Sequence, residues 1–247
     1  RRETLADIVQ NREDDQSVAY RHFRTLLFDD HPYARSTMGN HEDVSGLTWR
    51  EVQNHHGTVL RRAPVLVGLA GDIDVQRLRG RLQPMLETFT HGDLALPETA
   101  DPADRPGVRV QLVDKPARTQ SQIYMGHLGI RAAEPDYFPV ALLNTAFGGT
   151  YTARLSRQVR QERGWSYGAY SRMLRSVRRD AFYLWTFPAV EDMADCIELQ
   201  IQMLRELRDD GLTDEEFRFA RSYLANHYLF AVETASLRVA LALRQEV

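Results

Sequence analysis

The amino-acid sequence predicts an α+β fold with an internal domain boundary, on three observations. Strand patterns are grouped along the chain instead of alternating regularly with helix patterns, which favours separate layers over a doubly wound parallel sheet. Long amphipathic stretches in the last quarter of the chain are typical of helices that pack on a sheet. Residues 93–107 contain three prolines and four acidic residues without apolar periodicity, which is typical of a linker between domains.

The composition indicates a globular protein. The chain has 247 residues, of which 43% are hydrophobic and 26% charged, and its net charge is −3. It can therefore bury a core, and it lacks the basic field that attracts nucleic acid. No apolar run is long enough to cross a bilayer. A single cysteine, Cys196, excludes an internal disulfide and a zinc site of several cysteines. Both ends read as helix and no Met begins the chain, so we expect a fragment of a longer polypeptide.

Before the linker, helix patterns surround one short strand pattern. Residues 1–28 carry apolar side chains near helical spacing and are predicted to form one helix. Residues 29–40 contain Pro and Gly breakers and read as a loop. The apolar run at residues 65–72 predicts a buried strand. Asp74 is placed to cap a helix over residues 75–89.

After the linker, the strand patterns predict most of a sheet. Residues 108–114 alternate between apolar and polar side chains, and residues 120–130 give a second strand. Residues 135–147 begin with Pro and Asp and predict a helix. Residues 180–190 are rich in aromatic side chains and predict another strand, followed by an amphipathic helix over residues 192–209.

Two pairs of residues fit the capping-box pattern, in which each side chain bonds the other residue's free backbone N–H. The first pair, Thr48 and Glu51, marks the start of a helix before the linker. The second, Thr213 and Glu216, marks the start of a long helix near the C-terminal end. Gly211, just before the second pair, is placed to end the preceding helix.

The stretch from residue 147 to residue 171, FGGTYTARLSRQVRQERGWSYGAYS, is the most informative in the chain. It predicts a helix that carries Arg160, a helix end at Gly164, and a strand that carries Tyr167. On one continuous helix, these two side chains would lie two turns, about 10 Å, apart. The glycine instead lets the chain turn back and set Tyr167 beside Arg160.

No complete catalytic site is evident in the chain. A hydrolase needs a nucleophile, an activating group and a group that stabilises the oxyanion. The sequence lacks the Gly-x-Ser-x-Gly elbow and the glycine-rich phosphate-binding loops. None of its eight histidines has a second histidine one helical turn away with a glutamate between them.

Residues 147–171 resemble the Gly-Gly-x-x-x-x-Arg-Leu-x-x-x-x-Arg-x-x-x-Gly-x-x-Tyr region of the insulinase, pitrilysin and mitochondrial processing peptidase family. Other stretches resemble that family in the same order, and together they cover nearly the whole chain. They are HPYARSTMG with LTWREVQNHH, VLVGLAGDID, DKPARTQSQIYMGHLGI and GLTDEEFRFARSYL.

The resemblance implies two similar α+β domains that form half of a clam-shell around a chamber. Residues 1–92 would be the later half of the first domain. Residues 108–247 would be most of the second domain without its last elements. Both domains are therefore expected to be truncated in this chain, with residues 93–107 as the linker between them.

The resemblance also implies zinc chemistry. The active half of the family carries His-x-x-Glu-His and a distant glutamate ligand, and its zinc activates water with the motif glutamate as general base. That motif does not occur in this chain. Ser17 aligns with the distant ligand, with Glu13, Asp14 and Asp15 as alternatives in a shifted register. We therefore expect no metal ligand in this chain, and zinc only in an assembled enzyme.

The resemblance assigns Arg160 and Tyr167 to catalysis from across the chamber. Tyr167 would donate a hydrogen bond to the developing oxyanion, and Arg160 would hold a substrate carbonyl or main chain. Gly148, Gly149 and Arg154 of the same motif are candidate substrate-binding residues. The glycines would admit an extended peptide, although a simple turn would place them equally well.

The expected function is that of a non-catalytic, peptide-binding half of a zinc metallopeptidase. Expected partners are a peptide substrate and a zinc-bearing partner subunit or a second copy of the chain; nucleic acid is not expected. The zinc could equally lie on a missing N-terminal segment. Residues 120–130 could offer a sheet edge to a substrate, or form an interior strand. Alternatives are a non-proteolytic scaffold subunit of this family and an unrelated α+β binding module. A bacterial cytoplasmic or periplasmic location is expected.

Overall fold

The computed structural model describes residues 1–89, 94 and 98–245. Contacts group the chain into two compact units, one formed by residues 1–44 and 99–224 and the other by residues 45–98 and 225–247. The predicted mixture of helices and sheet is confirmed. Part of the predicted linker lies outside the described residues. The division into two related, truncated domains therefore stays a prediction.

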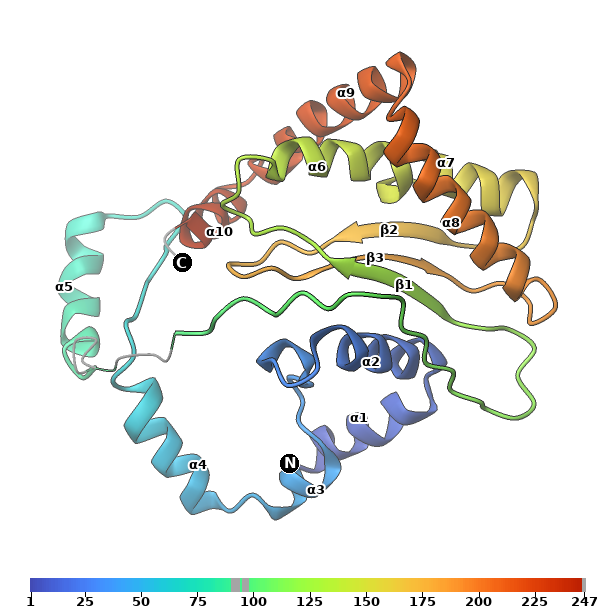
Figure 1. The fold of residues 1–247 in the computed structure, drawn as a ribbon. Coiled ribbons are helices and arrows are strands. Elements are labelled where there is room, and N and C mark those ends of the chain that lie inside the picture. The colour runs from blue at the N-terminus through green and yellow to red at the C-terminus, as the bar shows by residue number, and fades with distance from the viewer. Residues whose placement is uncertain (90–93, 95–97, 246–247) are drawn as a thin grey trace. The chain divides into compact units, whose positions relative to one another are not determined.

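A three-stranded antiparallel sheet forms the centre of the first unit (Figure 1). Its strands are β1 (Ile123–Leu128), β2 (Ala169–Met173) and β3 (Ala181–Thr186). The order is β1-β3-β2, so β3 lies in the middle and pairs with both neighbours. The strands predicted within residues 120–130 and 180–190 are confirmed.

One face of the sheet is covered by helices that follow β1 and β3 in the chain (Figure 1). These are α6 (Tyr137–Asn144), the short α7 (Arg154–Ser156) and α8 (Met193–Asp210), the last ending at Gly211 as predicted. Their apolar side chains and those of the sheet leave water together, which is the main driving force for this layer. The buried residues of this core are Phe147, Leu155, Val159, Ala169, Phe182, Leu184, Cys196, Met203 and Leu207.

The opposite face packs against the helix α2 (Asp15–Phe28), and the preceding helix α1 (Arg2–Glu13) packs on α2. The sequence predicted a single helix here, and this was wrong. Asp14 leaves the helical conformation, with ψ at 111°, and its side chain accepts a hydrogen bond from the backbone N–H of Ser17 at 2.7 Å. Apolar spacing does not register such a break, because the N-cap preference of Asp competes with helix continuation.

Aromatic rings and one arginine hold α2 on this face. Tyr20 and Phe23 contact the rings of Tyr124 and Tyr183 at centroid distances from 5.3 to 5.9 Å. Burial in this cluster raises the pKa of Tyr124 to about 12. Arg24 donates to Asp180 at the start of β3 at 3.0 Å, which ties the helix to the sheet by charge as well as by packing.

The second unit is mostly helical. The predicted capping box of Thr48 and Glu51 is confirmed, and Asp74 caps the next helix by accepting from the backbone N–H of Arg77 at 3.0 Å. The helices of this unit include α4 (Trp49–His55), η2 (His56–Leu60), α5 (Val75–Leu86) and α10 (Ala235–Gln245). Two short helices, η1 (Pro32–Ala34) and α3 (His41–Gly46), come between α2 and α4 in the chain.

Two predicted strands are wrong. Residues 65–72 and 108–114 form no strand, and their apolar side chains are not buried. Val108 is 93% exposed and Leu112 is 80% exposed. Alternation specifies which face of a strand would be buried, but a strand also needs a neighbour for its backbone hydrogen bonds. Among the described residues, neither segment pairs with such a neighbour.

A bidentate ion pair connects α7 to the first turn of α9 (Asp214–Ala231). Arg154 donates from Nε and Nη2 to the Glu216 carboxylate at 2.8 and 2.5 Å, and also to the carbonyl of Gly211 at 3.0 Å. The same carboxylate accepts from the Thr213 backbone at 2.9 Å, so the second predicted capping box is confirmed. The two charged side chains are only 14% and 16% exposed.

This pair predicts a pH-dependent contribution to stability. Hydrogen bonds from Arg154 lower the pKa of Glu216 from 4.5 to about 2. The contribution is therefore present above the ordinary pKa near 4.5 and is lost as the pH falls toward 2. We expect Glu216→Gln to lower the free energy of unfolding at neutral pH by roughly 1–3 kcal/mol. Urea unfolding should show this difference shrinking across the acidic window.

Glu215→Gln is the matched control, because Glu215 is an exposed neighbour in the first turn of the same helix. It should change the free energy of unfolding little at any pH. A difference between the wild type and Glu216→Gln that does not change from neutral to acidic pH would contradict the assignment.

A second prediction concerns Gly148, which is buried against β2. A Cβ atom there would lie 2.5 Å from Ser171 Oγ and 2.7 Å from Ser171 N. Gly148→Ala should therefore lower the free energy of unfolding by roughly 1–3 kcal/mol through overpacking. Gly80→Ala is the control, because nothing lies within 4 Å of its added Cβ. Equal melting temperatures for wild type and Gly148→Ala would show that the close approach is not required.

Candidate functional site

Arg160 lies on a π-helical turn, η4 (Arg157–Glu162), that continues α7. Leu155 and Val159 are fully buried in the core and anchor this stretch from beneath. The Arg160 side chain is half-buried, and its Cζ atom lies 4.1 Å from the centroid of the Tyr167 ring. The structure thus brings together the two residues that the sequence predicted to be neighbours.

Gly164 makes this approach possible. Its φ of 68° lies in the left-handed region that favours glycine. The Gly164 N–H donates to the carbonyl of Arg160, and the Trp165 N–H donates to that of Val159, both at 3.1 Å. The predicted helix end is confirmed. The placement of Tyr167 on a strand was wrong, because Tyr167 lies two residues before β2 begins, in the preceding turn.

The turn that carries Tyr167 is held from both sides. Ser166 is 3% exposed; its hydroxyl donates to the carbonyl of Gly168 at 2.6 Å and accepts from the backbone N–H of Phe187 at 3.0 Å. A Cβ atom at Gly168 would lie 2.7 Å from the Tyr170 ring. The Tyr167 side chain itself is 75% exposed. An exposed phenol is therefore presented from a well-packed turn.

A third residue, Tyr151, completes the group. The Cζ atom of Arg160 lies 4.6 Å from the centroid of the Tyr151 ring, and Tyr151 is 53% exposed. We call Tyr151, Arg160 and Tyr167 the Arg160 cluster. Sequence reasoning missed Tyr151, although it lies only two residues after Gly149. Its approach to Arg160 depends on the π-helical turns on both sides, which no spacing rule signals.

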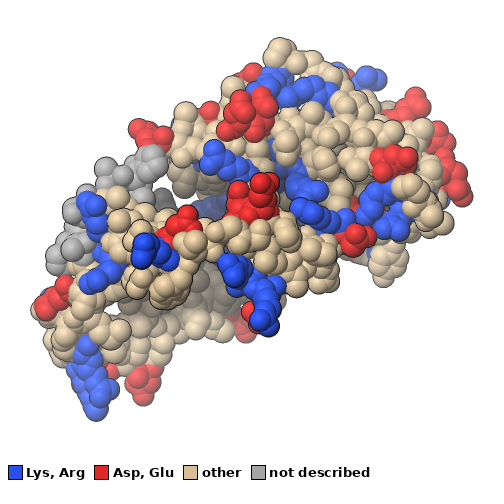
Figure 2. Space-filling model, turned by 90° about the horizontal axis from the view of Figure 1, so that it is seen from below, with Lys and Arg blue, Asp and Glu red and all other residues tan. Residues whose placement is uncertain are grey.

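The charge of Arg160 is not paired with an acidic side chain of the described residues. Neighbouring arginines on the same stretch do have acidic partners: Arg154 pairs with Glu216, and Arg157 lies 3.9 Å from Glu162. Acidic and basic side chains are intermingled on the face shown in Figure 2. The guanidinium of Arg160 contacts two aromatic faces, which orient a cation without supplying an acceptor for its N–H groups.

The other predicted binding residues have clear structural roles. Gly148 belongs to a second π-helical turn, η3 (Thr145–Gly149), and the close approach it permits is to Ser171 of β2. Gly149 is exposed and packs over Asn144. The donors of Arg154 are engaged by Glu216 and Gly211. Binding of substrate by these three residues stays a prediction.

Two of the residues considered as zinc ligands, Asp14 and Asp15, have other partners. Asp14 caps α2, and Asp15 lies 2.5 Å from Lys115 Nζ and 2.8 Å from Arg118 Nε. Hydrogen bonds from Lys115 and Arg118 hold the pKa of Asp15 below its ordinary value, although partial burial opposes this. In the part of the chain that the structure describes, no three His, Cys, Asp or Glu side chains are grouped to hold a metal ion. These residues do not fit the zinc site of the family.

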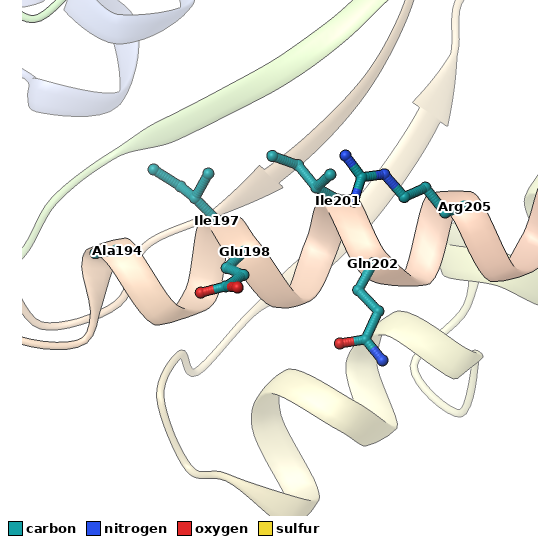
Figure 3. Close-up of a pocket in the computed structure, with 6 residues that line it drawn as sticks. All are labelled: Ala194, Ile197, Glu198, Ile201, Gln202 and Arg205. Carbon is teal, nitrogen blue, oxygen red and sulfur yellow. The ribbon is translucent and has the colours of Figure 1, made fainter.

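A shallow groove lies on the outer side of α8, away from these residues (Figure 3). It is lined by one helix alone, and Ile197 and Ile201 lie on one side of that helix with Arg205, as Figure 3 shows. It contains no group of converging polar side chains, so it offers no site for chemistry.

Within the described residues, no helix is long and apolar enough to cross a membrane.

Comparisons with known proteins identify the family. A profile of the peptidase M16 inactive domain matches residues 46–224. An uncharacterized zinc protease of Mycobacterium tuberculosis is 26% identical over 253 residues, covering 98% of this chain and 56% of the relative. A non-peptidase homolog of Helicobacter pylori is 21% identical, covering 95% of this chain and 54% of that protein. The chain spans about half the length of the curated relatives it matches.

A solved structure shows the same fold. The crystal structure of a peptidase M16 inactive domain from Pseudomonas fluorescens superposes with a TM-score of 0.82 at 24% identity, covering 92% of this chain and 55% of that one. The resemblance to the insulinase and pitrilysin family is therefore confirmed. Because the matching profile covers well over half of its residues, the chain belongs to the peptidase M16 inactive-domain family.

Proposed function

We propose that this chain is a peptide-binding, chamber-wall part of a zinc metallopeptidase, and that it supplies Arg160 and Tyr167 to a site whose zinc is held elsewhere. One observation carries this proposal. The Arg160 guanidinium lies 4.1 Å from the Tyr167 ring, and neither a carboxylate nor a carbonyl of the described residues takes up its hydrogen-bond donors. An exposed phenol hydroxyl and a cation are thus available together at one surface.

The two side chains are suited to the carbonyl of a peptide bond. Arg160 can donate N–H groups to a main-chain carbonyl of an extended peptide, with a charge-assisted bond that neutral donors cannot match. The Tyr167 hydroxyl can donate to the same oxygen, or to the neighbouring one, as negative charge develops during attack on the scissile bond. Because both groups are preorganised on packed turns, little reorganisation accompanies binding.

The zinc would be held outside the described residues, on a partner subunit or on another part of the same polypeptide. The relative from Mycobacterium tuberculosis is named a zinc protease, and that name supports zinc chemistry in the assembled protein. When bound, the metal would activate the attacking water. The described residues would bind and orient the peptide.

The edge of β1 is a second element for peptide binding. β1 pairs only with β3, so in the described part of the sheet its other edge has no ladder partner. An extended peptide can add to such an edge through main-chain hydrogen bonds. We propose that this edge aligns a peptide through its main chain. It is separate from the Arg160 cluster, because β2, which follows Tyr167, lies at the other edge of the sheet.

A non-proteolytic scaffold is the second candidate function. The relative from Helicobacter pylori is named a non-peptidase homolog, and one from Bacillus subtilis a probable inactive metalloprotease. A scaffold would not need the Arg160 cluster, and no zinc-bearing subunit would accompany it. Measuring zinc in the protein purified from its own cells, together with any partner, separates the two functions.

Removing the proposed catalytic groups should slow peptide cleavage by the assembled protein without unfolding it. Tyr167→Phe deletes only the hydroxyl and keeps the ring over Arg160, so kcat should fall about 100- to 1,000-fold, as for the loss of an oxyanion donor. Arg160→Ala should lower kcat/KM by a similar factor. The measurement is steady-state turnover of an unstructured fluorogenic peptide.

Arg157→Ala is the control, because Arg157 is an exposed arginine on the same turn whose nearest carboxylate, Glu162, lies 3.9 Å away. Its turnover should equal that of the wild type. Unchanged turnover in both Tyr167→Phe and Arg160→Ala would exclude the proposed role and favour the scaffold.

A further inference from the structure

Tyr151 has an unusual environment for an aromatic residue. It is 53% exposed, and its ring centroid lies 4.6 Å from the Cζ atom of Arg160. Its hydroxyl makes no hydrogen bond to a described residue. An aromatic side chain so placed contributes little to the core, so its effect on stability should be small.

The backbone on both sides of Tyr151 is nevertheless firmly packed. Thr150 is 8% exposed and Ala153 is 3% exposed, and the N–H of Ala153 donates to the carbonyl of Thr150 at 3.2 Å. Gly148, three residues before Tyr151, is pressed against β2. The ring of Tyr151 therefore projects from a turn whose position is set by the core.

Arg160 needs such support. An arginine side chain loses much rotamer freedom when it is fixed, and no acidic side chain of the described residues fixes this one. A single ring contact with Tyr167 leaves the guanidinium free to rotate about that contact. A second ring, carried by a separate packed turn, restricts the guanidinium in another direction and leaves its N–H groups unpaired.

We infer that Tyr151 is a positioning residue for Arg160: with Tyr167 it fixes the guanidinium so that its N–H groups meet the carbonyl of a bound peptide. The inference rests on the proposed function for its ligand, a main-chain carbonyl. The contact between Tyr151 and Arg160 does not depend on the proposed function. Tyr151 acts through its ring and not through its hydroxyl.

This assignment separates two substitutions of Tyr151. Tyr151→Phe keeps the ring and should behave as the wild type. Tyr151→Leu keeps an apolar side chain and removes the ring. It should weaken the affinity for a peptide about two- to fivefold, the effect of one exposed cation–π contact. The probe is a fluorescein-labelled unstructured peptide of mixed sequence, and the affinity is measured by fluorescence anisotropy.

A spectroscopic readout tests the contact without any ligand. Ring currents from Tyr151 and Tyr167 shift the Nε–H resonance of Arg160, which Arg160→Ala identifies in a nitrogen–proton correlation spectrum. Tyr151→Leu should move this resonance, and Tyr151→Phe should leave it nearly in place. Tyr137→Leu is the matched control, because it removes a comparable ring from Arg175, whose Cζ lies 5.8 Å from that ring.

The outcomes distinguish the two proposals. If Arg160→Ala weakens peptide binding and Tyr151→Leu does not, the positioning role is overturned while the proposed function stands. If the wild type binds no peptide, or Arg160→Ala binds as well as the wild type, the proposed function fails. In that case the Nε–H resonance of Arg160 is the remaining test of the positioning role. Its movement in Tyr151→Leu supports this role, and an unmoved resonance overturns it.

Discussion

The packing of residues 145–162 against one face of the sheet is the constraint on which the first unit depends. Phe147, Leu155 and Val159 are all fully buried there. Phe147 and Val159 lie on π-helical turns, which are wider than an α-helix, and Leu155 lies on the short α-helix α7. A wide turn rotates the side chains that follow it relative to an ordinary helix. The same turns that fill the core therefore also decide where Tyr151 and Arg160 emerge at the surface. Core and site cannot be varied independently along this stretch.

The sequence predicted those features that a local rule controls. Both capping boxes, the cap at Asp74, and the helix ends at Gly164 and Gly211 depend on residues within a few positions of each other, and all are found. The contact between Arg160 and Tyr167 was also predictable, because one left-handed glycine reverses the chain between them. In these places a few neighbouring residues determine the local backbone conformation, in agreement with the rest of the fold.

Features that a periodic pattern does not register were not predicted. The break at Asp14 is made by its side-chain cap on Ser17, but the apolar spacing is the same for one helix or two. Residues 108–114 have the alternation of a strand, yet no neighbouring backbone in the described part of the chain completes it. Tyr151 reaches Arg160 across a turn of non-standard width. In each case, the deciding contact lies beyond the reach of a periodic pattern.

The high exposure of Tyr151 and Tyr167 has a consequence for how this protein can change over generations. Side chains that bury little area contribute little to folding, so replacing them leaves the scaffold standing. A lineage could therefore lose the proposed chemistry of this surface in one or two steps and retain a stable, well-packed protein available for other uses. The stability of the fold does not by itself maintain such a site.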